Sequence, residues 1–292
     1  MNIREIDEIL EEGYSLKFIA QAYSDIANLK IKRIRAEVER NRIFFEEIAK
    51  IYDTVKFFAF KKKLFLKRPK NRLAILITSN YRFYGAINSS LIKYFVGSTA
   101  ELQDVDKIII GRAGIDFFKA NRILPKYQGL ILNTDMPTAL ELNNLAKYSS
   151  NYNQVQVFHS KFKSLLRQQA TFTDVTSVSY YLEEHVSDIR HLPLEGATDI
   201  RHMPYIFEPD LPKIVNFFDA QILTLLLEET FLESELSRTA SRFIRMDQAE
   251  TEANKFIKEY EKIKAYAKRS LINNAILENF AAMAALRKEQ YA

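Results

Sequence analysis

The chain contains no cysteine and no tryptophan, and it has only seven prolines and seven glycines in 292 residues. The absence of cysteine excludes disulfide bonds and cysteine-based metal sites. No uninterrupted apolar segment approaches the roughly 20 residues that a membrane-spanning helix needs. The start of the chain is polar and acidic, unlike a signal or transit peptide. The four histidines lack metal-ligand spacing, so we predict neither a metal site nor a cofactor.

The charge balance is mildly basic, with a net charge of +5 and a pI of about 9.1. A positive balance of this size favours an acidic protein surface as a partner. It is too small to indicate nucleic acid. With 47% hydrophobic residues, the chain can bury a core, so disorder is not expected.

Proline and glycine are distributed very unevenly. Residues 1–68 contain no proline and a single glycine, Gly13, and residues 213–292 contain neither proline nor glycine. Inside a helix a proline costs about 3 kcal/mol and a glycine about 1 kcal/mol relative to alanine. The two ends of the chain are therefore predicted to form long helices.

Apolar residues recur at three- and four-residue steps in both ends, which is helical spacing. The first stripe comprises Ile3, Ile6, Leu10, Ile19, Tyr23, Ile26, Ile34 and Val38. The second begins with Ile214, Phe218, Ile222, Leu225 and Leu232. Periodic patterns of this length are typical of coiled coils. Since a lone amphipathic helix gains too little from burial, we expect the two helices to pair with each other in antiparallel orientation.

The middle of the chain has a different pattern, in which short apolar segments alternate with helical ones. The predicted strands are 73–78, 107–110 and 154–158, and the predicted helices are 88–96, 113–121 and 138–148. Such alternation favours a parallel α/β sheet. Residues 176–212 are interpreted as a connection. The predicted fold is α+β overall: an antiparallel coiled coil (residues 1–68 and 205–292) with an inserted Rossmann-like α/β domain (residues 69–204).

Several motifs, in order along nearly the whole chain, resemble the gamma subunit of F-type ATP synthases. The most specific begin at Tyr205-Ile-Phe-Glu-Pro209 and continue with Ser237, Arg242, Met246, Ala249 and Ala253. The segments Thr78–Ser89 and Ile110–Phe118 also match. The chain departs from the family pattern at Tyr23, Ser24, Tyr84 and Asn274. These departures indicate a divergent member.

The resemblance implies a non-catalytic rotor subunit of the central stalk, which couples rotation to ATP synthesis or hydrolysis on an alternating hexamer of alpha and beta subunits. Further implied partners are an epsilon-like subunit and the membrane c-ring, with no nucleic acid. The implied location is peripheral, on the cytoplasmic face of the cell membrane. The implied ring contacts are Lys268, Arg269, Asn274, Glu278, Arg242, Lys255, Lys30 and Arg33. The implied bearing tip comprises Phe280, Met283 and Leu286.

Two alternatives remain open. The same scaffold could be the rotor of a specialised F-type-like ATPase that drives other mechanical work, such as gliding motility. A stand-alone α/β nucleotide-binding protein with a coiled-coil arm is the other. Gly111-x-x-Gly114 follows a predicted strand, but without a third glycine or a Walker lysine it favours a tight βα turn over a phosphate site. The carboxylates of Glu228, Glu229, Glu233 and Glu235 are interpreted as solvated charge on a helix face.

Overall fold

The computed structural model describes residues 2–290 apart from 62–69, 101–103, 123–125 and 176–206. The described helices are α1 (Ile3–Lys61), α2 (Ile87–Thr99), α3 (Arg112–Asn121), α4 (Ala139–Ser149) and α7 (Leu211–Gln290). The strands are β1 (Lys70–Ile77), β2 (Val105–Ile110), β3 (Gln128–Leu130), β4 (Tyr152–Phe162) and β5 (Gln168–Asp174). The predicted 176–212 connection lies mostly outside the described residues, as do three of the four histidines.

Both predicted terminal helices are present as single long helices of 59 and 80 residues. Gly13 lies inside α1, and Pro212 lies in the first turn of α7, where a missing N–H costs nothing. The chain divides into two compact units, residues 1–28 with 242–292 and residues 29–241, and each contains parts of both long helices.

In the first unit α1 and α7 pack through a small apolar cluster of Ile6, Leu10 and Ile257. Gly13 lies against α7 so closely that a Cβ built on it would be 3.2 Å from Ile257 Cγ1. The Lys264 ammonium pairs with Asp7 at 2.5 Å. Asp7 of α1 contacts Lys264 of α7, whereas the later residue Gly13 contacts the earlier residue Ile257. The two helices are therefore antiparallel in this unit, as predicted.

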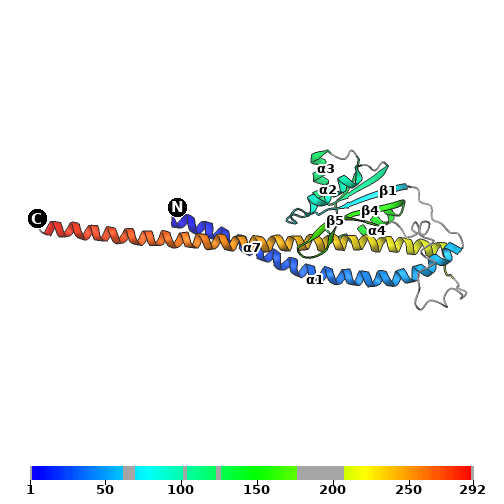
Figure 1. The fold of residues 1–292 in the computed structure, drawn as a ribbon, viewed down its shortest axis with the longest axis horizontal. Helices are drawn as coiled ribbons and strands as arrows, with labels where there is room; N and C mark the ends of the chain where they lie inside the picture. The colour runs from blue at the N-terminus through cyan, green and yellow to red at the C-terminus, as the bar shows by residue number, and fades with distance from the viewer. Residues whose placement is uncertain (1, 62–69, 101–103, 123–125, 176–206, 291–292) are drawn as a thin grey trace. The chain divides into compact units, whose positions relative to one another are not determined.

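The second unit holds the five-stranded sheet, whose order is β3-β2-β1-β4-β5. Figure 1 labels β1, β4 and β5 of this sheet. β1 pairs in parallel with β2 and β4, and β2 pairs in parallel with β3. This is the strand order of Rossmann folds, and it confirms the predicted Rossmann-like domain. β5 differs from the expectation of parallel pairing, because it follows β4 directly through a short hairpin and is antiparallel to it.

The sheet has an apolar core on each face. Residues of α2 and α3, including Phe95 and Phe118, pack on one face with Phe158 of β4. On the other face α4 packs together with α7, which contributes Leu223, Leu227 and Phe231. The long C-terminal helix is thus part of the α/β domain's own core.

A third cluster joins α1 to the start of α7 within the second unit. It contains Tyr52 and Val55 of α1 with Leu211, Val215 and Ile222 of α7. The Tyr52 and Phe218 rings stack with centroids 5.7 Å apart. The predicted pairing of the terminal helices is therefore confirmed in both units.

Candidate functional site

The residues predicted to contact a partner ring lie mostly on the exposed surface of α7. Lys255, Lys268, Arg269, Asn274 and Glu278 are all exposed, in the first unit. Arg242 is half-buried there. Because these cations are exposed to solvent, their charges are accessible to acidic groups on another molecule.

Beyond Lys268, α7 presents an uninterrupted exposed surface. Every residue from Lys268 to Met283 is exposed. The large apolar side chains in this stretch are 46–65% exposed and comprise Leu271, Ile272, Ile276, Leu277, Phe280 and Met283. Apolar side chains clustered in this way on a surface mark a protein contact.

Sequence reasoning identified Phe280 and Met283 of this exposed stretch but missed the four apolar residues before them. The side chain of Leu286, the third predicted tip residue, lies outside the described side chains, although the helix backbone there is described. The missed residues carried a usable signal. They continue the apolar stripe past the point where α1, which begins at Ile3, could cover it.

Lys268 also lines a groove of about 650 Å³ between α1 and α7 in the first unit. The groove walls carry both charges: Asp7, Glu11 and Glu261 face Lys264 and Lys268. Tyr14 donates its hydroxyl hydrogen to Glu261 at 2.7 Å, across the two helices. The Asp7–Lys264 ion pair and the Tyr14–Glu261 hydrogen bond cross this groove and fasten α1 to α7.

The two predicted contacts on α1 differ in their surroundings. Arg33 is exposed. Lys30 pairs with Glu235 of α7, and the Lys30 side chain is 43% exposed whereas Glu235 is fully buried. Lys30 therefore has a role inside the fold, and its role as a ring contact stays a prediction.

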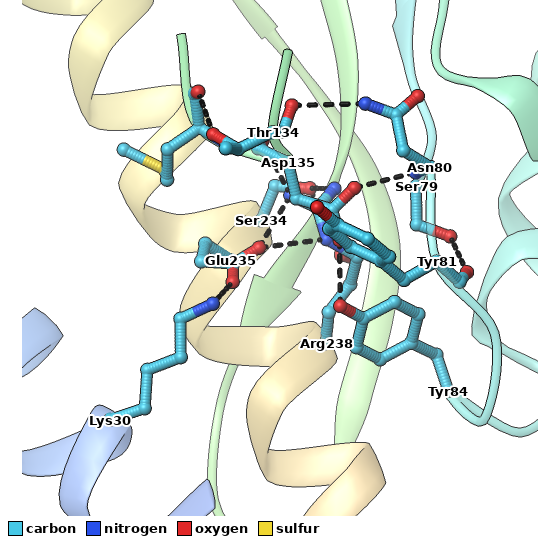
Figure 2. A network of polar contacts seen from close by, with 12 residues as sticks. Lys30, Ser79, Asn80, Tyr81, Tyr84, Thr134, Asp135, Ser234, Glu235 and Arg238 are labelled. Atoms are coloured by element: carbon cyan, nitrogen blue, oxygen red, sulfur yellow. Dashed lines mark hydrogen bonds and ion pairs between the residues drawn. The ribbon is translucent and has the colours of Figure 1, made fainter. Parts of the chain in front are cut away.

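The Lys30–Glu235 pair belongs to a buried polar network between α7 and the α/β domain (Figure 2). Arg238, 1% exposed, donates to Glu235 Oε2 at 2.8 Å and to Ser234 Oγ at 2.9 Å. It also donates to the main-chain carbonyl oxygen of Asp135 at 3.2 Å. One guanidinium thus joins the long helix to the loop after β3.

The loops after β1 and β3 continue the network. Tyr84 donates its hydroxyl hydrogen to Asp135 Oδ2 at 2.6 Å, and the Asn80 main-chain N–H donates to Asp135 Oδ1 at 2.5 Å. Asn80 Nδ2 donates to the carbonyl oxygens of Leu132 and Thr134, each at 3.0 Å. The network thereby links α1, α7 and two domain loops through the side chains of Lys30, Tyr84, Asp135, Glu235 and Arg238.

The interpretation of the α7 carboxylates as solvated charge was wrong for Glu235. Burial by itself would raise the pKa of Glu235, but Arg238 and Lys30 outweigh burial and hold it below its usual value. Glu228 and Glu233 are half-buried, and burial raises the pKa of each. Only Glu229 is exposed. The sequence could not reveal this burial, because it depends on the domain that packs against the helix.

The Gly111-x-x-Gly114 segment forms the tight βα turn that was predicted. The first main-chain N–H groups of α3 are already bonded: Arg112 to Asn80 Oδ1 at 3.1 Å, Ala113 to the Ser79 carbonyl oxygen at 3.0 Å, and Gly114 to Thr78 Oγ1 at 2.9 Å. A phosphate site needs such groups unbonded at a helix N-terminus. The turn therefore closes on the end of β1 and leaves no donors for a phosphate.

His159 is the one histidine within the described residues, and it is buried between β4, β5 and α7. Its Nε2 lies 2.8 Å from Thr173 Oγ1, and its Nδ1 lies 3.9 Å from Glu233 Oε2. Burial, with Lys161 and Arg238 nearby, lowers the pKa of His159 to about 4. The ring is thus neutral near pH 7. In the part of the chain that the structure describes, no three acidic or histidine side chains converge as metal ligands do.

None of the described helices is both long and apolar enough to cross a membrane.

A family match and several relatives agree with this architecture. The ATP synthase family profile matches residues 2–286. An ATP synthase gamma chain of Staphylococcus saprophyticus is 24% identical over 293 residues, covering 95% of this chain and 96% of the relative. An ATP synthase gamma chain from a Geobacter species is 22% identical over 288 residues, with the same coverage.

Solved structures are similar in fold. A chain in the mitochondrial ATP synthase of Euglena gracilis, solved with its c-ring, aligns with a TM-score of 0.65 at 16% identity and covers 99% of this chain and 96% of its own length. A chain from the central stalk and c-ring of the Tetrahymena thermophila mitochondrial ATP synthase has a TM-score of 0.59 at 20% identity, covering 79% of this chain and 99% of its own length.

Proposed function

This chain belongs to the ATP synthase family as a gamma chain, the non-catalytic rotor subunit of the F-type central stalk, and we propose that its exposed α7 surface turns inside an alternating hexamer of alpha and beta subunits. The family membership rules out the stand-alone nucleotide-binding alternative. The closed Gly111–Gly114 turn agrees with that exclusion.

The observation that carries the proposal is the exposed end of α7. A helix that leaves Leu277 and Phe280 about two-thirds exposed loses roughly 25 cal/mol for each square ångström of apolar surface left in water. A surrounding apolar sleeve would recover that free energy. Phe280, Met283 and Leu286 are proposed as the bearing tip within the sleeve.

The α7 cations that precede the bearing tip in the sequence are proposed as the contacts that sense ring conformation. Lys268 and Arg269 occupy adjacent positions, and so point about 100° apart around the helix. They would therefore reach different subunits of a surrounding ring. Arg242, Lys255, Lys30 and Arg33 are proposed as the next group, with Asn274 and Glu278 beside the tip.

These contacts are unequal around the helix, so each orientation of the rotor would favour different conformations of the catalytic subunits. A ligand or partner shifts a conformational equilibrium only by its differential affinity for the states. Exposed ion pairs are worth about 0.2–1 kcal/mol each, so a long cationic side chain can pass from one acidic group to the next. The proposed rotor thus biases the ring without locking it.

For the α/β domain we propose an epsilon-like subunit and the c-ring as partners. This would place the chain at the cytoplasmic face of the cell membrane as a peripheral member of a membrane-associated complex. The support is that relatives of similar fold occur in structures that include a c-ring.

Copurification tests the proposal directly. A tagged full-length chain should recover a hexameric ring with ATPase activity, while the purified chain alone should hydrolyse no ATP. Recovery of a monodisperse chain with its own turnover would refute the rotor proposal.

The contact residues are tested in the recovered complex. Combined Lys268→Ala and Arg269→Ala substitutions should lower rotor-dependent ATPase activity by roughly twofold to thirtyfold, since each lost ion pair is worth about 0.2–1 kcal/mol. Lys262→Ala is the matched control, because Lys262 is also an exposed α7 cation and is not among the proposed contacts. Equal effects of the two changes would contradict the assignment.

The specialised-ATPase alternative rests on the departures at Tyr23 and Ser24, where Ser24 is only 8% exposed. A serine buried at this point cannot replace an exposed cation, so torque contacts on α1 are proposed to begin further along, at Lys30 and Arg33. Copurification of a proton-translocating ring would indicate a synthase. A hexameric ring recovered with motility proteins and without a proton-translocating ring would indicate the specialised machine.

A further inference from the structure

The hairpin between β4 and β5 presents two leucines to solvent at its tip. Residues 163–167 form the turn, and Leu165 and Leu166 are 37% and 82% exposed. An exposed leucine by itself needs no explanation. Two adjacent ones at the tip of a β-hairpin are unusual, because hairpin turns favour glycine, asparagine and other small polar residues.

The hairpin tip is held in shape by its own hydrogen bonds. The main-chain N–H groups of Lys163 and Ser164 donate to the Arg167 carbonyl oxygen at 3.2 and 3.0 Å. The Gln168 side-chain amide donates to the carbonyl oxygens of Ser164 and Leu165 at 3.1 and 2.6 Å. The Arg167 N–H donates to Ser164 Oγ at 3.1 Å. The two leucines are therefore displayed from a fixed frame.

The base of the hairpin is anchored to α1. The Arg35 guanidinium lies over the Phe162 ring, 5.4 Å from its centroid. The β4–β5 ladder continues to the residue before the turn, with Phe162 opposite Gln168. A partner bound at the tip would therefore be mechanically connected to α1 and to the sheet.

The charge around the leucines has one sign. Lys161, Lys163 and Arg167 are exposed, and no acidic residue occurs from position 151 to 173. The positive charge of Lys161 is partly compensated, because it interacts electrostatically with the Glu233 carboxylate of α7. Among the described residues no carboxylate forms an ion pair with Lys163 or Arg167. Within the part of the chain that the structure describes, two cations without an ion-pair partner thus lie directly beside the exposed leucines.

We propose that this hairpin is a docking surface for an acidic loop or helix carrying at least one apolar side chain, on another subunit of the rotary complex. The inference rests on the proposed function, since it places the partner within that complex. The cations would pair with the acidic side chains while Leu165 and Leu166 bury against the apolar one. This surface is distinct from the exposed end of α7.

A protein partner fits the hairpin better than a lipid surface does. The hydrogen-bonded frame fixes the leucines and cations relative to each other, and preorganisation raises affinity when the partner also has a fixed shape. A fluid bilayer gains little from a fixed arrangement. Two leucines and three cations would also bind a lipid surface only weakly and reversibly.

Site-specific photo-crosslinking in the copurified complex tests the proposal. A photoreactive amino acid replaces Leu166, and adducts are identified by mass spectrometry. Leu140 is the matched control position, because it is 72% exposed on the same domain but precedes Glu141 and lacks the cationic neighbours. We expect a protein adduct from position 166 that maps to an acidic segment, in clear excess over position 140.

Charge reversal then checks the recognition chemistry. Lys163→Glu with Arg167→Glu should lower the yield of that adduct roughly tenfold, because two ion pairs become two repulsions. The same double change should leave thermal stability nearly unaltered, since both side chains are exposed. No excess over position 140, an adduct with lipid, or an adduct on a segment without acidic residues would each overturn the docking proposal. Failure to recover any ring would overturn the proposed function instead.

Discussion

The Arg238 side chain of α7 donates a hydrogen bond of 3.2 Å to the main-chain carbonyl oxygen of Asp135, which lies 103 positions earlier in the chain. The same guanidinium is bound to Glu235 at 2.8 Å. A buried cation therefore holds a loop of the α/β domain against the helix that forms the rotor shaft. The carbonyl oxygen alone could not compensate a buried guanidinium, so Glu235 and Asp135 act together on Arg238.

Arg238→Met should destabilise the second unit strongly. The change leaves Glu235 buried with Lys30 as its remaining cation, and removing one partner of a buried pair typically costs about 3–5 kcal/mol. Urea denaturation followed by circular dichroism measures the loss. Arg245→Met is the control, because Arg245 is exposed on the same helix.

The double change Glu235→Leu with Arg238→Met distinguishes charge burial from packing. Replacing both members of a buried pair with apolar side chains is often close to neutral. We therefore expect the double variant to be more stable than Arg238→Met alone. The opposite order would mean that Lys30 alone compensates the buried Glu235 carboxylate once Arg238 is gone.

His159→Gln should flatten the acid side of the stability profile. The pKa of His159 is lowered to about 4 in the folded chain, whereas an unfolded histidine titrates near 6.5. The unfolded state thus binds the proton first, so stability falls as the pH drops from about 6.5 towards 4, by up to about 3 kcal/mol. Urea midpoints of both proteins at pH 7.5, 6 and 4.5 measure the difference.

The neighbouring Glu233 titrates in the opposite sense, because burial raises its pKa. Its protonation on acidification favours the folded state and reduces the net slope in both proteins. The difference between wild type and His159→Gln removes that shared contribution. If the two profiles stay parallel between pH 7.5 and 4.5, the pKa of the buried imidazole is not lowered.

Gly114→Ala should destabilise the α/β domain. A Cβ at position 114 would lie 2.8 Å from Ile109 Cγ2 and 2.9 Å from Thr78 Oγ1, so β1 or β2 must shift. Overpacking of this kind costs about 1–3 kcal/mol. Gly97→Ala is the matched control within a helix, because nothing lies within 4 Å of its Cβ position. That change should instead stabilise by about 0.4–1 kcal/mol, and thermal melts of both variants check the two signs.

Gly13→Leu should separate α1 from α7 in the first unit. A Cβ there already lies 3.2 Å from both Ile257 and Phe256, and a leucine adds three further carbons at the same point. Hydrogen exchange of the α1 amides before residue 20 should accelerate by roughly tenfold, equivalent to about 1.4 kcal/mol. Glu12→Leu, at an exposed neighbouring position, should leave these rates nearly unchanged. Unaltered exchange in Gly13→Leu would show that the Ile257 and Phe256 side chains make room for the leucine without separation of the helices.

The sheet illustrates how far local sequence signals reach. The segments at 73–78 and 107–110 predicted β1 and β2, because buried parallel strands are continuously apolar. The segment at 154–158, where glutamine alternates with valine, predicted β4. β3 has three residues and β5 reads Gln-Gln-Ala-Thr-Phe-Thr-Asp, so neither carries that signal. Each is an edge strand of the sheet, and its conformation depends on pairing with β2 or β4 rather than on its own composition.

The predicted contact residues illustrate the same division. Lys268 and Arg269 are exposed as expected, because nothing in the described chain covers them. Lys30 and Glu235 are both charged residues within long helices, yet the Lys30 side chain is 43% exposed and Glu235 is fully buried. Whether a charged helical residue meets water or a guanidinium depends on which element packs over it.

The sequence alone determined the two long helices and the α/β domain between them. Excluding proline and glycine over so many positions has a local energetic cause that needs no tertiary context. Only the tertiary structure decided that α7 enters the core of the sheet through Leu227 and Phe231, and that Arg238 joins the domain to the shaft. It also decided that the β4–β5 hairpin displays Leu166. These features arise where segments distant in sequence meet, and burial and pairing energies exist only after they have met.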